Sequence, residues 1–312
     1  MAIYKLDEKV NLIKEISFKY EKEIQNIVEE NIEILLGYKL IKSEFTIKNF
    51  RIDSLCFDNE SKSFVIIEFK KDKNFSVIDQ GYAYLSLMLN NKADFILEFN
   101  ENNQSNHLRK NDVDWSQSRV IFISPSFTNY QREAINFKDL PIELWEIKQY
   151  ENLTISFERI QKNNVKESIT TISKNNEDVE QVSNEIKVFT ENDHLQNIEK
   201  EIVEIYETFR DRVLNLEDSI ELLPKKRYIS FIFENKIFTD VLIQKRSLKI
   251  FLNIKKGELS DVKNIVRDVS DIGHLGNGSY EIQISDLEDI DYIISLVKQS
   301  LKINKIENGL IV

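Results

Sequence analysis

Asp53, Glu68 and Lys70 carry the side chains that a hydrolytic centre needs, and their spacing predicts that they lie together. Residues 64–67 (FVII) form a continuous apolar run, which is typical of a strand covered on both faces. The run leads directly into Glu68-Phe69-Lys70. Because residues two apart share one face of a strand, Glu68 and Lys70 are expected to point the same way and Phe69 the other.

Asp53 lies in the preceding predicted strand, residues 51–57, on the face that also carries apolar side chains. A lone charge is costly there, so the carboxylate needs a partner. If the polar turn at 58–63 joins the two strands as an antiparallel pair, Asp53 comes opposite Glu68. Two carboxylates beside a lysine form a site for a hard divalent cation such as Mg²⁺, and the lysine can position an attacking water or offset developing charge.

The helix predicted over 78–89 would place two polar side chains above the same end of this sheet. Its start is marked by the capping box at 76–79, which leaves Gln80 and Tyr84 four residues apart on one face. The alternative interpretation is an ordinary helix face, on which Tyr84 packs and Gln80 is solvated.

The order of these residues on strand, strand and helix resembles that of PD-(D/E)XK nucleases. The resemblance implies an α/β N-terminal domain of the restriction-endonuclease-like type, a mixed sheet flanked by helices. It also implies metal-dependent hydrolysis of phosphodiester bonds in DNA, with Mg²⁺ as the cofactor and Mn²⁺ as a substitute. The matching residues are Asp53, Glu68, Lys70, Gln80 and Tyr84.

The resemblance further implies a role for each residue. Asp53 and Glu68 would hold the metal together with the Phe69 carbonyl, and Lys70 would place the attacking water. The two helix residues would orient the substrate or the lysine. A first-helix glutamate helps to hold the metal in many such enzymes, and Glu21 is the candidate here. Glu21 is expected about 45° from the centre of its helix's apolar stripe, so it is equally explained as a glutamate favoured by a helix N-terminus.

Longer stretches are similar to a large family of bacterial proteins that have such a nuclease-like N-terminal domain and a C-terminal domain of unknown role. They are residues 43–58, 64–85 and 113–131 in the first part of the chain. The similarity continues from about 198 to 301, including the GHLGNG segment. It therefore covers nearly the whole chain and implies the fold more firmly than the activity.

Bulk composition narrows the class of protein. A chain of 312 residues, 41% hydrophobic and 30% charged, is expected to form two soluble domains, each with its own core. One cysteine, Cys56, allows no internal disulfide, and there is neither an apolar leader nor a run of about 20 apolar residues. We therefore expect a cytoplasmic protein with no membrane partner.

The net charge of −11 argues against general affinity for nucleic acids. It leaves room for a local basic path beside an acidic metal site. Two basic clusters, at 225–228 and 245–249, are candidates for such a path, although the ends of solvated hairpins explain them as well.

The predicted organisation is a nuclease-like domain over 1–160, a polar linker over 161–187 and a smaller α+β domain over 188–312. The linker's composition predicts an exposed connector. In the second domain we expect a helix, an antiparallel sheet and a final helix. Its glycine-rich segment leads into a strand rather than a helix, which favours a structural turn over a phosphate-binding loop.

Two functions of different class remain open. The first is a DNA nuclease whose second domain selects the substrate or binds a partner, including a second copy of the chain. The second is an inactive nucleic-acid-binding or regulatory module that keeps the nuclease fold. The absence of a strong base-reading motif and the negative charge favour the latter.

Overall fold

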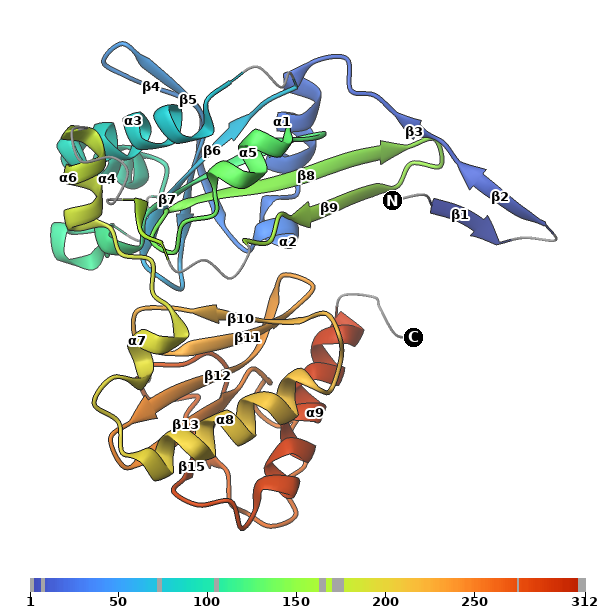
Figure 1. Ribbon diagram of the computed structural model, residues 1–312, viewed down its shortest axis with the longest axis vertical. Coiled ribbons are helices and arrows are strands. Elements are labelled where there is room, and N and C mark those ends of the chain that lie inside the picture. The colour runs from blue at the N-terminus through green and yellow to red at the C-terminus, as the bar shows by residue number, and fades with distance from the viewer. Residues whose placement is uncertain are drawn as a thin grey trace. The chain divides into compact units, whose positions relative to one another are not determined.

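The computed structural model describes residues 3–6, 9–71, 75–103, 107–162, 167–169, 177–273 and 275–307. The chain divides into two compact units, Met1–Val188 and Phe189–Val312 (Figure 1). Each unit has its own sheet and its own hydrophobic core. Among the helices that are described, none is long and apolar enough to cross a membrane.

The first unit is built on a seven-stranded mixed sheet with the order β3-β8-β7-β6-β5-β4, in which β9 also pairs with β8. The central strands β6, β7 and β8 run parallel, and the other pairs are antiparallel. A separate antiparallel pair precedes the sheet. The strands are β1 (Ile3–Leu6), β2 (Val10–Ile13), β3 (Glu15–Ile16), β4 (Lys39–Ile47), β5 (Phe50–Asp58), β6 (Ser63–Phe69), β7 (Arg119–Ser124), β8 (Ile142–Tyr150) and β9 (Ile155–Arg159).

Helices cover both faces of this sheet, as the predicted fold class requires. Side chains of α1 and α2 form one core with Val65 and Ile67 of β6, and those of α3, α4 and α6 form another with Phe64 and Ile66. The apolar run of β6 is thus buried on both sides, which explains its composition. The helices are α1 (Glu21–Glu30), α2 (Ile32–Leu36), α3 (Val77–Asn90), α4 (Lys92–Glu101), α5 (Asn129–Ala134) and α6 (Glu177–Glu185), with short 3₁₀ turns η1 (Lys110–Asp112) and η2 (Trp115–Gln117).

The expected exposed connector over 161–187 is wrong for the residues that the structure describes. Helix α6 lies against α3 in Figure 1, and Val179 and Val182 are buried in the core shared with α3. Ile169 and Ile186 are buried there as well. Four well-placed apolar side chains therefore tie a polar segment to the first unit. Residues 163–166 and 170–176 of the expected linker lie outside the described residues.

The second unit is an α+β domain, as expected. Its six-stranded sheet is antiparallel in every pair, with the order β10-β11-β12-β13-β15-β14. Side chains of two long helices, α8 and α9, close its core. The elements are α7 (Glu191–Leu195), α8 (Lys200–Leu214), β10 (Ile220–Pro224), β11 (Ile229–Phe233), β12 (Lys236–Gln244), β13 (Ser247–Leu252), β14 (Arg267–Asp268), β15 (Tyr280–Ile284) and α9 (Ile290–Glu307).

The glycine-rich segment of the second unit behaves as a structural turn. Gly278 has φ +84°, and a Cβ there would lie 1.9 Å from the Leu252 carbonyl oxygen. A Cβ on Gly276 would lie 2.3 Å from the Phe251 ring. Close approach to β13 thus accounts for Gly276 and Gly278, whereas nothing lies within 4 Å of a Cβ at Gly273.

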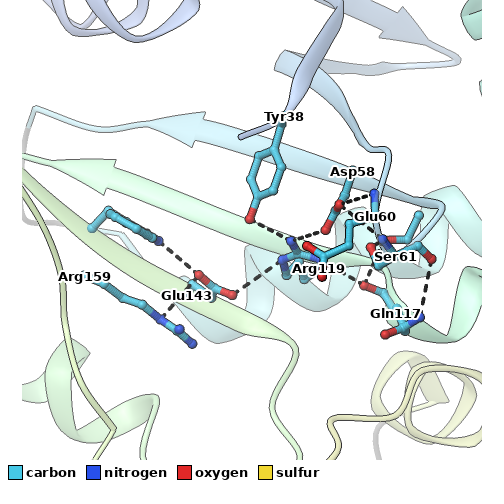
Figure 2. A network of polar contacts seen from close by, with 10 residues as sticks. Tyr38, Asp58, Glu60, Ser61, Gln117, Arg119, Glu143 and Arg159 are labelled. Atoms are coloured by element: carbon cyan, nitrogen blue, oxygen red, sulfur yellow. Dashed lines mark hydrogen bonds and ion pairs between the residues drawn. The ribbon is translucent and has the colours of Figure 1, made fainter. Parts of the chain in front are cut away.

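A dense polar network lies at the end of the first sheet where β6, β7 and β8 begin (Figure 2). Arg119 donates to the Asp58 carboxylate at 2.9 Å and to the Tyr38 hydroxyl at 2.6 Å. Its Nε is 3.5 Å from Glu143, which also accepts from the Trp145 indole at 3.0 Å. Each carboxylate of this network therefore meets a cation or donor.

Candidate active site

The candidate site lies at the opposite end of the same strands, where β6 ends. The register of β5 and β6 pairs Ser54 with Ile67, so the next rung places Asp53 opposite Glu68, as the sequence predicted. An oxygen of Asp53 accepts a hydrogen bond from the Phe69 backbone N–H at 2.9 Å. The two carboxylates thus come together on the sheet face that α3 covers.

Glu68 is a buried carboxylate whose two oxygens have different surroundings. Glu68 as a whole residue is 4% exposed to solvent. Oε1 accepts from the Lys70 ammonium at 2.6 Å and from the Gln80 amide at 2.9 Å. Oε2 is buried without a hydrogen-bond partner. An anionic oxygen in that state is costly, so a cation at Oε2 would stabilise the site.

Asp53 is half-buried, and its pKa is raised to about 6. Burial is the largest cause, because it disfavours the charged form, and the negative charge of Glu68 adds to it. The Phe69 N–H and the Lys70 charge oppose the rise. Holding the two carboxylates close together therefore makes Asp53 harder to ionise.

Helix α3 brings its two polar residues to the site. Ser76 caps the helix by accepting from the Asp79 N–H, which fixes its start. Gln80 then reaches Glu68 and also donates to the Tyr84 hydroxyl at 3.1 Å. The Tyr84 hydroxyl donates in turn to the Arg51 carbonyl at 3.3 Å. The alternative interpretation, an ordinary helix face on which Gln80 is solvated, does not hold because the Gln80 amide donates to two side chains.

Glu21 is the predicted site residue that the structure does not add to the pair. It begins α1, and its carboxylate accepts from the Lys71 N–H at 2.9 Å. Across the described part of the chain, no three Asp, Glu, His or Cys side chains are grouped so that they could hold a metal. Asp53 and Glu68 thus stand as a pair, with Glu21 beside the segment that follows β6.

The donor set fits a hard divalent cation. Mg²⁺ prefers one or two carboxylates and completes its shell with water and phosphate oxygens, which a pair of carboxylates allows. The partnerless Oε2 of Glu68 and the raised pKa of Asp53 are both properties that a bound cation would relieve.

Two residues that contact Asp53 or lie opposite it were missed by the sequence analysis. Gln25 of α1 is buried and donates to the Asp53 carbonyl at 3.0 Å. Glu44 of β4 lies across from Asp53, because the rungs on either side pair Ser43 with Ser54 and Phe45 with Ile52. No local pattern marks either residue, since both positions follow from how α1 and β4 are placed against β5.

Comparisons with known proteins agree with the two-unit description. Residues 20–96 match the family model described as the endonuclease NucS C-terminal domain, which contains the whole candidate site. Residues 191–304 match the model of a domain of unknown function, DUF5655. An uncharacterized protein of Haemophilus influenzae is 49% identical over 290 residues, 93% of this chain and 95% of that protein. The chain belongs to the same family as that protein.

The predicted resemblance to a two-domain family with a nuclease-like first domain is therefore confirmed. Solved structures give weaker similarities. A repair endonuclease from Pyrococcus abyssi has a TM-score of 0.22 at 18% identity, over 43% of this chain and 60% of that one. SfsA of Pyrococcus furiosus in complex with Ca²⁺ has a TM-score of 0.25 at 13% identity, over 52% and 76%. Values this low do not bear on function.

Proposed function

We propose that the first unit is a metal-dependent nuclease that hydrolyses phosphodiester bonds in DNA. One observation carries the proposal: Asp53 and Glu68 face each other across β5 and β6, and Glu68 keeps a buried oxygen without a partner. Lys70 and Gln80 occupy only the other oxygen. The match to an endonuclease domain family over residues 20–96 supports the same activity.

Asp53, Glu68 and the Phe69 carbonyl would hold Mg²⁺, for which Mn²⁺ can substitute. The metal would supply charge stabilisation at the phosphoryl oxygens and a more acidic water. The protein's part is to hold both carboxylates in place, and the backbone N–H of Phe69 fixes Asp53 and opposes the rise of its pKa.

Lys70 would position the attacking water, because its ammonium lies at Glu68 and over the Phe75 ring, 5.9 Å from the ring centroid. Gln80 and Tyr84 would orient the lysine and the substrate through their chain of hydrogen bonds. The second unit would select the substrate or bind a partner, a second copy of this chain included. The single buried Cys56 suits a reducing cytoplasm.

A regulatory or nucleic-acid-binding module without activity is the second candidate. It is favoured by the Lys70 ion pair, which already neutralises part of the Glu68 charge, and by the want of a third metal-binding side chain within the described ranges. Such a module would keep the pair for structure.

Cleavage of a supercoiled plasmid by the purified chain distinguishes the nuclease from the inactive module. With Mg²⁺ or Mn²⁺ we expect nicking by the wild type, loss of nicking in Asp53→Ala, and unchanged nicking in Asp94→Ala, an exposed aspartate in the first turn of α4. Failure of the wild type to cleave in either metal while it still binds DNA would support the module. Cleavage that survives Asp53→Ala would assign the activity elsewhere.

A further inference from the structure

Two basic side chains meet one carboxylate beside the candidate site. Lys22 of α1 lies 3.1 Å from Glu44 of β4, and Arg51 of β5 donates to the other oxygen of the same carboxylate. These three residues form what we call the rim cluster. The proposed catalytic roles use none of them, yet Glu44 lies across from Asp53, between the paired rungs Ser43–Ser54 and Phe45–Ile52. Arg51 is two residues before Asp53.

The backbone of Glu44 is unusual for a strand. Its φ is +56°, in the left-handed region that residues with a Cβ seldom occupy. Such a conformation persists only where the surroundings enforce it, and it is frequent at functional sites. It interrupts the pairing of Glu44 with Asp53, and the Glu44 carboxylate lies instead at Lys22 and Arg51.

The two cations are exposed, and Arg51 is also anchored through its backbone. The side chains of Lys22 and Arg51 are 53% and 67% exposed. The Arg51 carbonyl accepts from Tyr84, which is bonded to Gln80 and through it to Glu68. The base of the arginine is therefore fixed to the same network as the carboxylate pair, while its guanidinium reaches solvent.

The chemistry of the rim cluster suits a phosphate. A guanidinium offers paired donors that match phosphate oxygens, and an ammonium adds a point charge. Exposed ion pairs contribute little to stability, so a phosphate can replace the Glu44 carboxylate at small cost. In a chain of net charge −11, a polyanion needs such a local cationic contact to approach two carboxylates.

We propose that Lys22 and Arg51 bind a backbone phosphate of the nucleic acid next to the one that is cleaved, and that Glu44 occupies them in the free protein. This assignment rests on the proposed nuclease function and names the contacts that hold its substrate. Glu44 acts as a competing anion, so it limits affinity for nucleic acid instead of adding to it.

Binding of a fluorescein-labelled DNA duplex to the full chain tests the assignment. The measurement is made in EDTA, where no cleavage occurs, as a function of salt. Lys22→Gln and Arg51→Gln should each weaken binding about threefold to tenfold near about 100 mM salt and lower the salt slope by about 0.9. Arg51→Lys should keep the slope. Glu44→Gln should bind more tightly than the wild type.

Lys92→Gln is the matched control, because Lys92 also pairs with an acid, Glu185, but begins α4, a different helix from the one that carries Gln80. It should bind as the wild type does. Unchanged binding by Arg51→Gln, or weaker binding by Glu44→Gln, would overturn the assignment. A chain that never cleaves but shows the expected binding pattern would refute the nuclease function and leave the phosphate contact standing.

Discussion

The two ends of the first sheet use similar residues to opposite effect. At the starts of β7 and β8, Arg119 is surrounded by Asp58, Tyr38 and Glu143 (Figure 2). The charges of Arg159 and Arg119 lower the pKa of Glu143 despite its burial. At the end of β6, Lys70 meets Glu68 on one oxygen only, and the pKa of Asp53 is raised. One end holds its carboxylates charged and paired, and the other holds them close and incompletely paired.

The difference shows what each end contributes. A buried ion network with all partners present contributes to stability only as a whole, since removing one member strands the others. A carboxylate pair without enough cations costs stability, which is the usual cost of a functional site. We therefore expect substitutions in the Arg119 network to lower stability, and substitutions in the carboxylate pair to leave stability unchanged or to raise it.

Arg119→Met should give the largest effect. It removes the cation that faces Asp58 and Glu143 and leaves both carboxylates buried, which we expect to lower the free energy of unfolding by about 3–5 kcal/mol. Urea denaturation measures it, with the exposed Arg109→Met as the control that should change little. If Arg119→Met lowered the free energy of unfolding less than the control did, the Arg119 network would not stabilise the first unit.

Asp53→Asn and Glu68→Gln should behave oppositely. Without metal each should unfold at or above the wild-type temperature, because the repulsion between the two carboxylates is gone. With Mg²⁺ or Mn²⁺ at about 100-fold above Kd, the wild type should gain about 2.7 kcal/mol and the variants should lose most of that gain. Thermal melts with and without metal measure both effects. Metal-independent melting of the wild type would rule out the nuclease.

The pH dependence of stability tests the strained state of the carboxylate pair at the end of β6. In EDTA, folded Asp53 with a pKa of about 6 retains a proton that the unfolded chain, with the ordinary carboxyl pKa of about 4, has already released. Between those values the native state binds more protons, so the contribution of Asp53 to stability falls as pH rises through that window. Denaturation of wild type and Asp53→Asn from pH 4 to 7 should show their difference widening in favour of the variant, and a constant difference would contradict the raised pKa.

Tyr84→Phe should give the smallest effect. It removes one hydroxyl that links Gln80 to the Arg51 carbonyl, so we expect a loss of about 1 kcal/mol or less in stability. Cleavage should slow several-fold if Gln80 orients the lysine. Comparing kcat/KM with the melting temperature separates these effects, and the expected pattern is a several-fold slower rate with only that small loss of stability.

Local rules predicted the parts of the fold where they are strong. The apolar run at 64–67 is β6, the Ser76 cap starts α3, and the polar turn after Asp58 makes β5 and β6 an antiparallel pair. From that register the Asp53 and Glu68 pairing followed. Their roles in catalysis, like that of the Phe69 carbonyl, stay predictions.

What sequence patterns missed depends on contacts between distant elements. The helix that begins at Glu21 ends at Glu30, and Asn31 separates it from α2. The polar segment after 176 forms α6 because α3 offers its valines a surface. The φ of Glu44 is likewise set by how β4 meets β5 and α1, and no residue type announces it.

The attachment of α6 also bears on modular exchange between proteins. Composition suggests a joint near residue 160, but a recombination there would separate Val179 and Val182 from the core that they complete. A joint just after Val188 leaves that core whole and transfers Phe189–Val312 as a unit. The polar segment is thus inherited with the nuclease-like half, and an evolutionary exchange of the second half is expected to begin downstream of it.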